Sequence, residues 1–320
     1  MVSALGQPLP PTGDRQHRTL LGGKRPLPAQ VAVYLFVTVP LLALLVAVPL
    51  AWGHGLTWLD VVLAAAWYTV TCLGVTVGFH RHFTHRSFKA TRPLRIALAV
   101  TGSLAVQGPI LHWVADHRRH HTYSDQEGDP HSPWEFGTSP AALARGFWHA
   151  HLGWILNRDL TNQQRFAPDL LADPDLLRVD RLFWLWTLIT LTAPALIGGL
   201  VTWSWWGALT AFLWAGLVRV AFLHHITWSV NSVCHMIGDR PFASRDKSAN
   251  VWPLAILSMG ESWHNLHHAD PTSARHGVGP GQIDVSARLI WMFEKAGWAR
   301  DVRWPTPERL ARLRASGVDG

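Results

Sequence analysis

Four long apolar runs limit what this chain can fold into. The first occupies residues 31–52 without a charged side chain, and the others lie at about 59–80, 182–203 and 205–228. Asp60 and Arg219 are the only charged residues in these runs. Because a helix needs about 20 apolar residues to cross the hydrocarbon core of a bilayer, the sequence predicts an all-α membrane protein with four transmembrane helices in two hairpins.

The composition agrees with this class. Only 15% of the residues are charged and 48% are hydrophobic, whereas roughly 25% are charged in an average soluble domain. The 19 tryptophans are typical of a membrane protein, because tryptophan collects at membrane–water interfaces. The formal net charge is +7, but no Lys/Arg run is dense enough for a nucleic-acid groove. These features exclude an ordinary soluble enzyme, a disordered chain and a nucleic-acid partner.

The positive charges predict the orientation in the membrane. The short loops 53–57 and 203–206 contain no Lys or Arg, whereas 81–181 and the region after residue 238 contain many. By the positive-inside rule, both termini and the polar blocks 81–181 and 229–300 are predicted to be cytoplasmic. We expect a polar N-terminal tail over 1–30, one membrane-and-cap domain over 31–300 and a C-terminal tail over 301–320.

Residues 94–115 form a further apolar stretch, which Gly102, Gly108 and Pro109 interrupt. Glycine weakens a helix and proline breaks or kinks it. We therefore interpret this stretch as a helix that lies in or dips into the membrane interface, rather than as a fifth span.

Histidines gather in four clusters on the predicted cytoplasmic side. His80 and His85 end the second span, and on an ideal helix they would point about 140° apart. They converge only if the helix ends or bends between them. Residues three or four apart share a helical face, so two further triplets and one pair are predicted to direct their side chains to one place. These are His117, His120 and His121; His264, His267 and His268; and Asn231 with His235. Isolated histidines such as His276 are predicted to be ordinary hydrogen-bonded residues.

Clustered imidazoles are typical ligands of Zn, Cu, Fe and Ni. The clusters contain nine histidines, which exceed the four ligands of a single zinc ion and fit two metals that share a site. Both cysteines lie outside the clusters and no carboxylate occurs at the repeated spacings. Two iron ions that activate O₂ are therefore the favoured pair.

Other metal functions compete with this interpretation. A haem would need a matching histidine at membrane depth on the facing spans, and a zinc hydrolase would be expected to carry HExxH, which the sequence lacks. A metal transporter would place polar ligands along a path inside the membrane, whereas these clusters lie past the ends of the spans. A histidine-rich metal transporter stays as the non-enzymatic alternative.

These segments resemble the membrane fatty acyl desaturase family, close to the stearoyl-CoA Δ9 type and to its bacterial members. The resemblance covers about residues 60–300. It is carried by the stretches GVTVGFHRHFTHRSF (74–88), QGPILHWVADHRRHH (107–121), GDPHSP (128–133), TWSVNSVCH (227–235) and GESWHNLHH (260–268).

The resemblance implies that 31–300 is a desaturase domain, with four transmembrane helices under a cytosolic helical cap. The nine clustered histidines would bind two irons in a non-haem diiron centre, and Asn231 would contact one iron through water. The implied reaction is O₂-dependent desaturation of a long-chain saturated acyl thioester, with acyl-CoA and a cis Δ9 double bond favoured. The implied location is the bacterial cell (inner) membrane, with the active site and both termini cytoplasmic.

The resemblance also implies substrate contacts along an acyl tunnel. Those at its bend are Gln107, Trp113 and Thr227, with Trp228 beside them; those near its closed end are Tyr68 and Cys72; and those toward the carrier are Asp116 and Arg158. Two positions depart from the family pattern. Ala115 stands where animal relatives commonly have arginine, and Asp159 follows Arg158 in place of lysine. Because coenzyme A is rich in phosphate, acyl carrier protein and glycerolipid stay as alternative carriers.

Reduction of O₂ takes four electrons, of which the substrate supplies two. The sequence contains no GxGxxG nucleotide motif and no set of iron–sulfur cysteines. It therefore predicts an external NAD(P)H-dependent reductase with a ferredoxin- or cytochrome-type carrier. Basic residues predict a docking face for an acidic carrier, namely Arg118, Arg119, Arg145, Arg158 and Arg165. Within the oxidases, a fatty-acyl or alkane hydroxylase with the same type of site is the alternative function.

Overall fold

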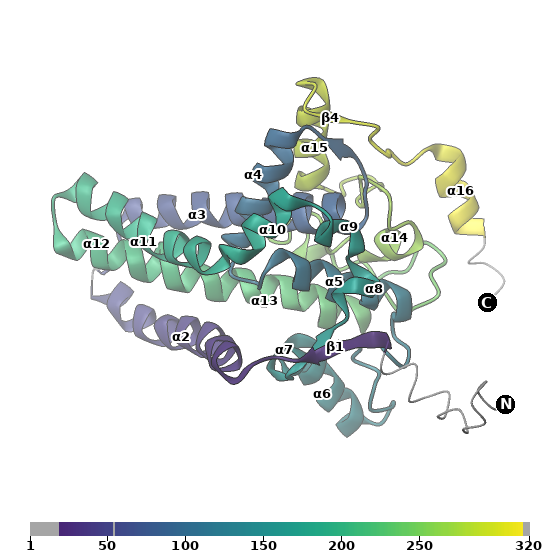
Figure 1. Ribbon diagram of the computed structural model, residues 1–320, viewed down its shortest axis with the longest axis horizontal. Helices are drawn as coiled ribbons and strands as arrows, with labels where there is room; N and C mark the ends of the chain where they lie inside the picture. Colours follow the sequence, from purple (N-terminus) through teal and green to yellow (C-terminus); the bar gives the residue numbers. More distant parts are fainter. Residues whose placement is uncertain (1–18, 54, 316–320) are drawn as a thin grey trace.

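The computed structural model describes residues 19–53 and 55–315. In this part of the chain, four helical segments are long and apolar enough to cross a membrane: Leu27–Trp52, Trp58–Thr84, Phe183–Thr202 and Trp205–His235. They lie together at one end of the molecule, and shorter helices form a cap at the other end (Figure 1). The predicted fold class, an all-α membrane protein with four such helices and a helical cap, is confirmed.

The four spans differ in their construction. The first is α2 (Leu27–Trp52) and the third is α11 (Phe183–Thr202). The second joins α3 (Trp58–Leu73) to the π-helical segment η1 (Gly74–Thr84). The fourth consists of α12 (Trp205–Ala211), the π-helical η3 (Phe212–Val218), α13 (Arg219–Ser232) and the 3₁₀ turn η4 (Val233–His235). The second and fourth spans thus stay helical into the segments that carry histidines.

A capping box explains why a charged residue begins the second span. The Thr57 hydroxyl accepts a hydrogen bond from the Asp60 N–H at 3.3 Å, and the Asp60 carboxylate accepts one from the Thr57 N–H at 2.9 Å. This reciprocal pair satisfies backbone donors that the first turn of a helix leaves free. Asp60 is buried for this reason, although it lies in an apolar run.

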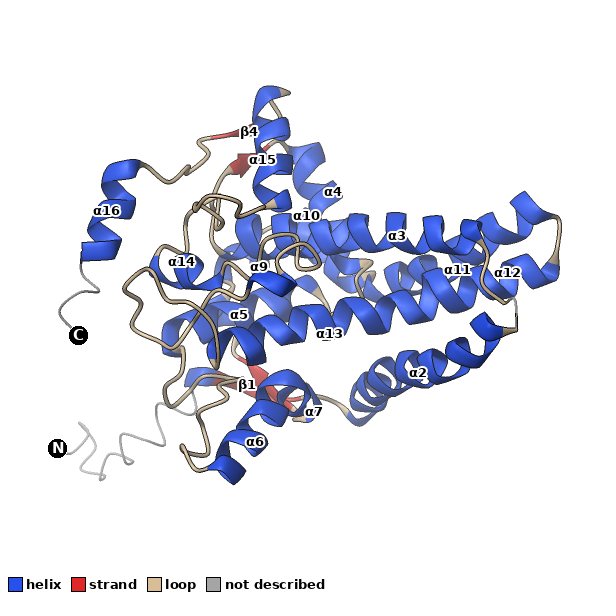
Figure 2. Ribbon diagram, turned by 180° about the vertical axis from the view of Figure 1, so that it is seen from behind, coloured by secondary structure: helices blue, strands red, loops and turns tan. Residues whose placement is uncertain are grey.

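The two pairs of spans pack differently. α11 and α12 lie close together, because a Cβ atom on Gly198 would stand only 2.5 Å from the Gly207 carbonyl oxygen. α2 and α3, in contrast, both pack against η3, and they lie on opposite sides of the fourth span (Figures 1 and 2). A short connection in the sequence therefore does not produce a tightly packed pair at the first hairpin.

The cap is assembled from short helices and two small antiparallel sheets. β1 (Leu21–Lys24) pairs with β3 (Asp159–Thr161), and β2 (Lys89–Ala90) pairs with β4 (Ala299–Arg300). The helical elements are α4 (Arg92–Ser103), α5 (Ile110–Tyr123), α6 (Pro140–Trp148), η2 (His149–Gly153), α7 (Trp154–Leu156), α8 (Gln163–Phe166), α9 (Pro168–Leu171), α10 (Pro174–Arg181), η5 (Trp252–Leu254), α14 (His264–Ala269), α15 (Val285–Lys295) and α16 (Pro307–Ala315). β1 and α16 fall within the regions predicted as tails, and the division into 1–30, 31–300 and 301–320 stays a prediction.

The single helix predicted over 94–115 is instead two helices, α4 and α5. The chain turns between them, where Val106 has a φ of 59° and Gly108 a φ of 101°. α4 packs closely on the second span, since a Cβ on Gly74 would lie 2.3 Å from the Thr101 carbonyl carbon. Neither helix is among the segments long enough to span a membrane. α5 buries one face, including Ile110, Val114 and Ala115, in the largest apolar core, and this packing fixes the direction of its histidines.

Candidate metal centre

A change of helix type brings His80 and His85 together. Their ring centroids are 4.8 Å apart, and the His85 N–H donates a hydrogen bond to the His80 carbonyl at 3.1 Å. In a π-helix each bond joins residues five apart, so η1 places these two residues above one another. The sequence predicted that the helix must end or bend here, and a π-helical segment achieves the same convergence.

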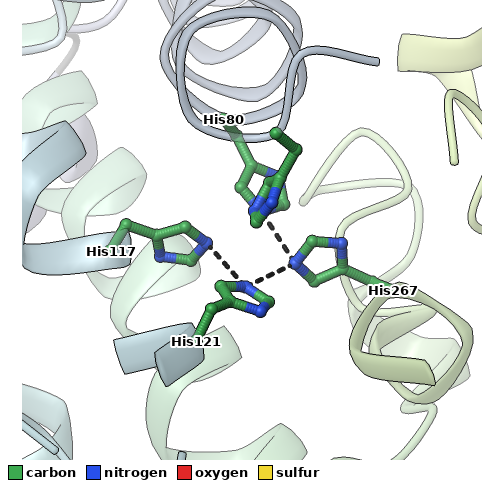
Figure 3. Close-up of side chains that lie close together, drawn as sticks. His80, His117, His121 and His267 are labelled. Carbon is green, nitrogen blue, oxygen red and sulfur yellow. Dashed lines mark hydrogen bonds between the residues drawn. The ribbon is translucent and has the colours of Figure 1, made fainter. Parts of the chain in front are cut away.

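The nine clustered histidines form two adjacent groups. Within each group, the candidate ligand nitrogens all lie within 4.8 Å of one another. The first group contains His80, His85, His117, His121 and His267, and the second contains His120, His235, His264 and His268. Figure 3 shows four members of the first group, His80, His117, His121 and His267, pointing toward one another. The groups meet where the rings of His121 and His268 stack, with centroids 4.4 Å apart.

Each HxxHH triplet is divided between the two groups. The i, i+4 pairs, His117/His121 and His264/His268, stay together, whereas His120 and His267 belong to the opposite group. Adjacent residues on a helix are rotated by about 100°, so the residue before the last histidine of each triplet points to a different place. The prediction that each triplet directs all three imidazoles to one place is therefore wrong.

Buried carboxylates hold one ring nitrogen of several histidines. Asp129 lies 3.0 Å from His120 Nδ1, Asp125 lies 3.0 Å from His235 Nδ1, and Asp246 lies 2.6 Å from His268 Nδ1. In the first group, Glu261 lies 2.5 Å from His80 Nδ1. A carboxylate beside Nδ1 keeps the proton there, so Nε2 is left with its lone pair for a metal ion.

The spacing of the Nε2 atoms fits metal ligation. His264 Nε2 lies 3.1 Å from His235 Nε2 and 3.0 Å from His268 Nε2. One proton on His264 satisfies only one of these contacts, whereas a metal ion satisfies both. Imidazole nitrogens about 2.0–2.1 Å from a metal lie about 3 Å from one another.

The first group has the same spacing. His267 Nε2 lies 3.0 Å from His80 Nε2 and 2.9 Å from His121 Nε2, and His117 Nε2 lies 3.2 Å from His121 Nε2. The Nε2 atom of His85 is buried and has no hydrogen-bond partner. Two sets of buried nitrogen donors thus fit two metal ions.

Electrostatics favours neutral imidazoles in both groups. Burial, together with repulsion between neighbouring rings, lowers the pKa of His85, His117, His121, His264 and His267 well below 6.5. Burial also lowers the pKa of His268 to about 4, although Asp246 opposes it. Burial by itself would raise the pKa of Asp129, but His120 and His131 hold it below its usual range. Neutral imidazoles beside ionised carboxylates are the protonation states that bind metal.

Sequence reasoning missed several residues around these groups. The carboxylates of Asp125, Asp129 and Asp246 are far in sequence or irregularly spaced from the histidines that they contact. His276 is buried, and its ring lies 4.6 Å from the ring of His267 and 5.7 Å from that of His80. His131 stacks on His120, with centroids 4.2 Å apart. Only Asp129 and His131 had a signal, because both fall in the GDPHSP stretch.

A cavity of about 340 Å³ leads to the histidines. Side chains of α2 and α11 line part of it, including Ala32, Phe36 and Trp184. Both helices belong to candidate membrane spans. The ring of Phe36 lies 5.5 Å from that of Trp184. The lining also contains polar groups of the cap and of both histidine groups, among them Asp116, His80, His117, Asn231, Glu261 and His264. An apolar chain in this cavity would meet histidines of both groups directly.

The residues predicted at the tunnel bend do form one cluster. The Gln107 side-chain amide donates to the Thr227 hydroxyl at 2.7 Å, and the Trp113 indole N–H donates to the Gln107 carbonyl oxygen at 3.2 Å. All three line the cavity, as does Trp228. The structure therefore gathers the predicted bend residues on the wall of one cavity.

Three other predicted substrate residues do not line this cavity. Tyr68 and Cys72 are buried in a separate apolar cluster with Leu223, and the Tyr68 hydroxyl donates to the Leu257 carbonyl at 2.5 Å. The Arg158 guanidinium donates to the Arg25 carbonyl at 2.9 and 3.1 Å, and this contact ties the cap to the start of α2. Ala115, the position of a carrier-binding arginine in animal relatives, is completely buried.

Comparisons with known proteins show which family this chain is similar to. A family model for fatty acid desaturases matches residues 56–278. The chain is 38% identical over 279 residues to the hex-5-enoyl-[acyl-carrier protein] acetylenase of Moorena producens (strain JHB). The aligned region covers 86% of this chain and 87% of the relative.

Two further relatives are acyl-lipid desaturases by their names. The chain is 37% identical over 263 residues to the Delta-9 acyl-lipid desaturase 1 of Arabidopsis thaliana, with 80% of this chain and 79% of the relative covered. It is 34% identical over 250 residues to the sn-1 stearoyl-lipid 9-desaturase of Anabaena variabilis, with 77% and 85% covered. The family match spans more than half of the chain and includes both histidine groups. This protein therefore belongs to the fatty acid desaturase family, a family of oxidoreductases, and is a membrane protein.

Proposed function

We propose that this protein introduces a cis double bond into a long-chain saturated fatty acyl group, with O₂ as co-substrate. In the balanced reaction, R–CH₂–CH₂–R′ + O₂ + 2 H⁺ + 2 e⁻ gives R–CH=CH–R′ + 2 H₂O. The observation that carries the proposal is the cavity whose wall joins apolar side chains of two spans to both histidine groups. A site of this kind holds an unreactive chain beside metal ligands.

Two iron ions are the cofactors of this proposal. His80, His85, His117, His121 and His267 would hold one, and His120, His235, His264 and His268 would hold the other. The family resemblance adds Asn231, which lines the cavity together with His264, as a contact through water. The iron centre supplies the oxidant that amino-acid side chains lack. Nitrogen-rich donor sets suit iron, whereas Mg²⁺ and Ca²⁺ prefer oxygen ligands.

The chain's own residues position the substrate and exclude water. The hydrogen-bonded cluster of Gln107, Thr227 and Trp113 stands on the cavity wall between the spans and the histidines. A saturated chain offers no polar group near its middle, so its position is measured from its head group to this wall. The names of the Arabidopsis and Anabaena relatives support position 9 for the double bond.

The carrier that fits best is a membrane glycerolipid, in preference to the acyl-CoA that the family resemblance first favoured. The cavity is lined by Ala29, Val33 and Phe36 of α2 and by Trp184 of α11, so an acyl chain can pass between two spans from the bilayer. Ala115 is buried, and Arg158 is engaged with the Arg25 carbonyl. Alanine and aspartate occupy positions 115 and 159, where animal relatives carry arginine and lysine, so two cations expected to meet coenzyme A are missing. Acyl-CoA and acyl carrier protein become outcomes of the test.

The carrier can be tested with purified protein offered three stearoyl donors: stearoyl-CoA, stearoyl-acyl carrier protein and distearoyl phosphatidylglycerol. We expect turnover of the lipid. Ala32→Trp, which fills the passage beside α2, should slow lipid turnover about tenfold or more. Val31→Trp is the matched control, because Val31 is exposed and does not line the cavity. A lipid carrier would be contradicted if stearoyl-CoA or stearoyl-acyl carrier protein were turned over faster than the lipid, and if Ala32→Trp and Val31→Trp changed the rate equally.

The function itself is tested by expression in a desaturase-deficient host. Lipids are extracted, and mass spectrometry locates each new double bond. A single monounsaturated product at position 9 supports the proposal. A hydroxylated chain would instead support the fatty-acyl or alkane hydroxylase, and purified protein with fewer than two irons would contradict the metal assignment.

The proposed location is the bacterial inner membrane, with both termini and the cap cytoplasmic. The distribution of Lys and Arg supports this orientation, and it gives a cytoplasmic reductase access to the cap. Cys72 and Cys234 are buried, so single cysteines can be introduced on this background. Trp205→Cys, at the exposed first residue of α12, should react with an impermeant thiol reagent in whole cells. Thr138→Cys, in the cap, should react only after lysis, and the reverse pattern would overturn the orientation.

A further inference from the structure

A second cavity, of about 360 Å³, reaches the histidine groups by a different route. It is lined by His121, Ser244, Arg245, Asp246, His268 and Pro271, among others. It shares no lining residue with the cavity of about 340 Å³ beside α2 and α11, which we call the substrate cavity. Polar and apolar groups line this cavity in equal measure, whereas the lining of the substrate cavity is mostly apolar. The centre thus has two approaches of different chemistry.

Both histidine groups contribute a ring to the second cavity. His121 belongs to the first group and His268 to the second, and their rings stack with centroids 4.4 Å apart. An electron that arrives at this cavity therefore has to pass through only one imidazole ring to reach either group. This feature would be of no use to the acyl chain, which meets His80, His117 and His264 in the other cavity.

The loop over the second cavity, residues 239–247, exposes its three cations and the anion Asp239, and it buries its other anion, Asp246. Arg245 is exposed and donates to the His121 carbonyl. The Asp246 carboxylate faces His268 at 2.6 Å and also accepts from the Ser248 hydroxyl. Lys247 is exposed, with its ammonium 3.3 Å from the centre of the Trp134 ring. The outer surface of this loop is therefore positive.

α16 extends the same positive surface. The Ala243 N–H donates to the Leu313 carbonyl at 3.0 Å, and Arg314 lies over the Phe242 ring at 5.2 Å. Residues 239–247 and 307–315 together contain six Lys or Arg and three Asp or Glu, one of which is the inward-facing Asp246. α14 and α16 lie at the end of the molecule away from the α11–α12 connection (Figures 1 and 2), which is the end open to a soluble protein.

Three of the arginines predicted as a docking face are partly buried, whereas Arg240, Arg245 and Lys247 of the loop are exposed. The Arg118 guanidinium bonds to Asp169 at 2.6 Å and to the carbonyls of Phe83 and Thr84. Arg119 donates to the Gly128 carbonyl at 2.7 Å, and Arg158 is engaged as described above. These three side chains hold the cap together, which leaves the exposed Arg145 and Arg165 on that side.

We propose that an acidic one-electron carrier protein docks on the surface formed by residues 239–247 and α16. The carrier delivers two electrons, one at a time, through the His121/His268 edge, and each delivery oxidises one carrier molecule. The electrons are the two that the balanced desaturation requires, in addition to those from the substrate C–H bonds. This inference rests on the proposed function, because it assumes a reaction that draws electrons from outside. Positive and negative surfaces that match steer such encounters and set their salt dependence.

The test measures both binding and turnover of the full-length protein, reconstituted in nanodiscs. The probe is an acidic [2Fe–2S] ferredoxin at low and moderate salt. The charge-reversal pair Lys247→Glu/Arg314→Glu should raise the dissociation constant of the ferredoxin tenfold or more and flatten its salt dependence. Arg145→Glu/Arg165→Glu is the matched control with the same change in charge, and it should change the constant less than twofold.

A second reductant separates docking from chemistry. With dithionite and methyl viologen, which need no docking surface, the Lys247→Glu/Arg314→Glu variant should desaturate at the unaltered rate. If both charge-reversal pairs weaken binding equally, or if only the control pair does, the proposed surface is wrong. If dithionite drives no desaturation in the unaltered protein, the proposed function fails, while the binding measurement still decides the docking surface.

Discussion

The two histidine groups have the same kind of ligand but different surroundings. In the second group, carboxylates hold three of the four rings, at His120, His235 and His268. In the first group, Glu261 holds His80, and a comparable carboxylate contact is absent from the other four rings in the described part of the chain. A ring held by a carboxylate has its tautomer and direction fixed before metal arrives. The second group is therefore the more preorganised.

Exposure follows the same division. All four rings of the second group are buried, whereas His117 and His121 of the first group are partly exposed. Each group nevertheless reaches both cavities: His117 and His264 line the substrate cavity, and His121 and His268 line the second cavity. The groups therefore differ in how their rings are held, because carboxylates fix most of the second group and the first group is more open.

The largest effects should come from removing one ligand from each group. His267→Ala and His264→Ala should each abolish desaturation, because a histidine at either position closes a ligand set. In each variant the iron content should fall from two to about one per chain, because the loss is confined to the affected group. Iron analysis of the purified variants, with circular dichroism to confirm folding, measures this. Full activity in either variant would remove that histidine from the ligand set.

Changing a carboxylate should sharpen the comparison. Asp129→Asn removes the charge beside His120, and loss of such a partner typically costs about 10–100-fold in metal affinity or activity. We expect iron to leave the second group first when the variant is titrated with a chelator. Asp169→Asn is the control, because Asp169 pairs with Arg118 and Arg86 on the cap and contacts no histidine. Equal iron retention in the two variants would argue against preorganisation of the second group.

Substitutions in the wall of the substrate cavity should leave iron bound in both histidine groups. Thr227→Val leaves the Gln107 amide without its 2.7 Å partner, and an unsatisfied buried polar group costs about 1–3 kcal/mol. A misplacement of about 1 Å lowers a rate on the order of 100-fold. We therefore expect a rate at least tenfold lower, or double bonds at several positions, with normal iron content. Gln107→Leu should behave in the same way. If both variants gave a single product at the unaltered rate, other residues would determine the position of the acyl chain in the cavity.

Acid should act through the histidines and through the carboxylates in different pH ranges. The pKa values of His85, His117, His121 and His267 lie well below 6.5 in the folded protein because of burial, whereas unfolded histidine has a pKa near 6.5. The unfolded chain then binds more protons below about pH 6.5, so the stability of the metal-free protein falls as the pH falls below that value.

The carboxylates of the second group affect the stability of the protein at lower pH than the histidines do. The pKa of Asp125, Asp129 and Asp246 is depressed in the folded state by their histidine partners, against the effect of burial. Their contribution is present above about pH 4 and is lost as the pH falls further. Melting temperatures of the chelator-treated protein should decline from pH 6.5 to 5. His117→Gln/His121→Gln should flatten that decline, whereas Asp129→Asn should not.

The spans and the histidine clusters were predictable from sequence because both are local patterns. A run of about 20 apolar residues is a sufficient signal for a membrane helix, and i, i+4 histidines share a face wherever a helix forms. The rotation of about 100° between adjacent helix residues separates His120 from His121 and His267 from His268, but which group each of them joins depends on the neighbours of α5 and α14. The π-helical segment at His80 was likewise hidden, since periodicity assumes an α-helix.

The carboxylates and His276 could not be assigned to the site from the sequence. Asp246 reaches His268 from a loop 22 residues earlier, and Asp125 reaches His235 across 110 residues. Such contacts exist only after the cap has packed, and an aspartate in a polar loop resembles any surface residue. His276 carries no spacing signal, yet it lies beside His267. Carboxylates that position metal ligands are found through tertiary contacts.

The smallest effect is expected at a histidine that lies close to the first group in sequence but outside it in space. His82 sits between His80 and His85, and its Nδ1 lies 3.1 Å from the Phe88 carbonyl oxygen. Its ring packs against the Phe88 ring, 4.8 Å away, rather than among the nitrogens of the first group. In His82→Gln an amide can replace the hydrogen bond, which is worth about 0.5–1.5 kcal/mol. We expect iron content to stay near two per chain and the desaturation rate to change less than twofold. If His82→Gln instead lost iron as His267→Ala does, the boundary drawn here around the first group would be wrong.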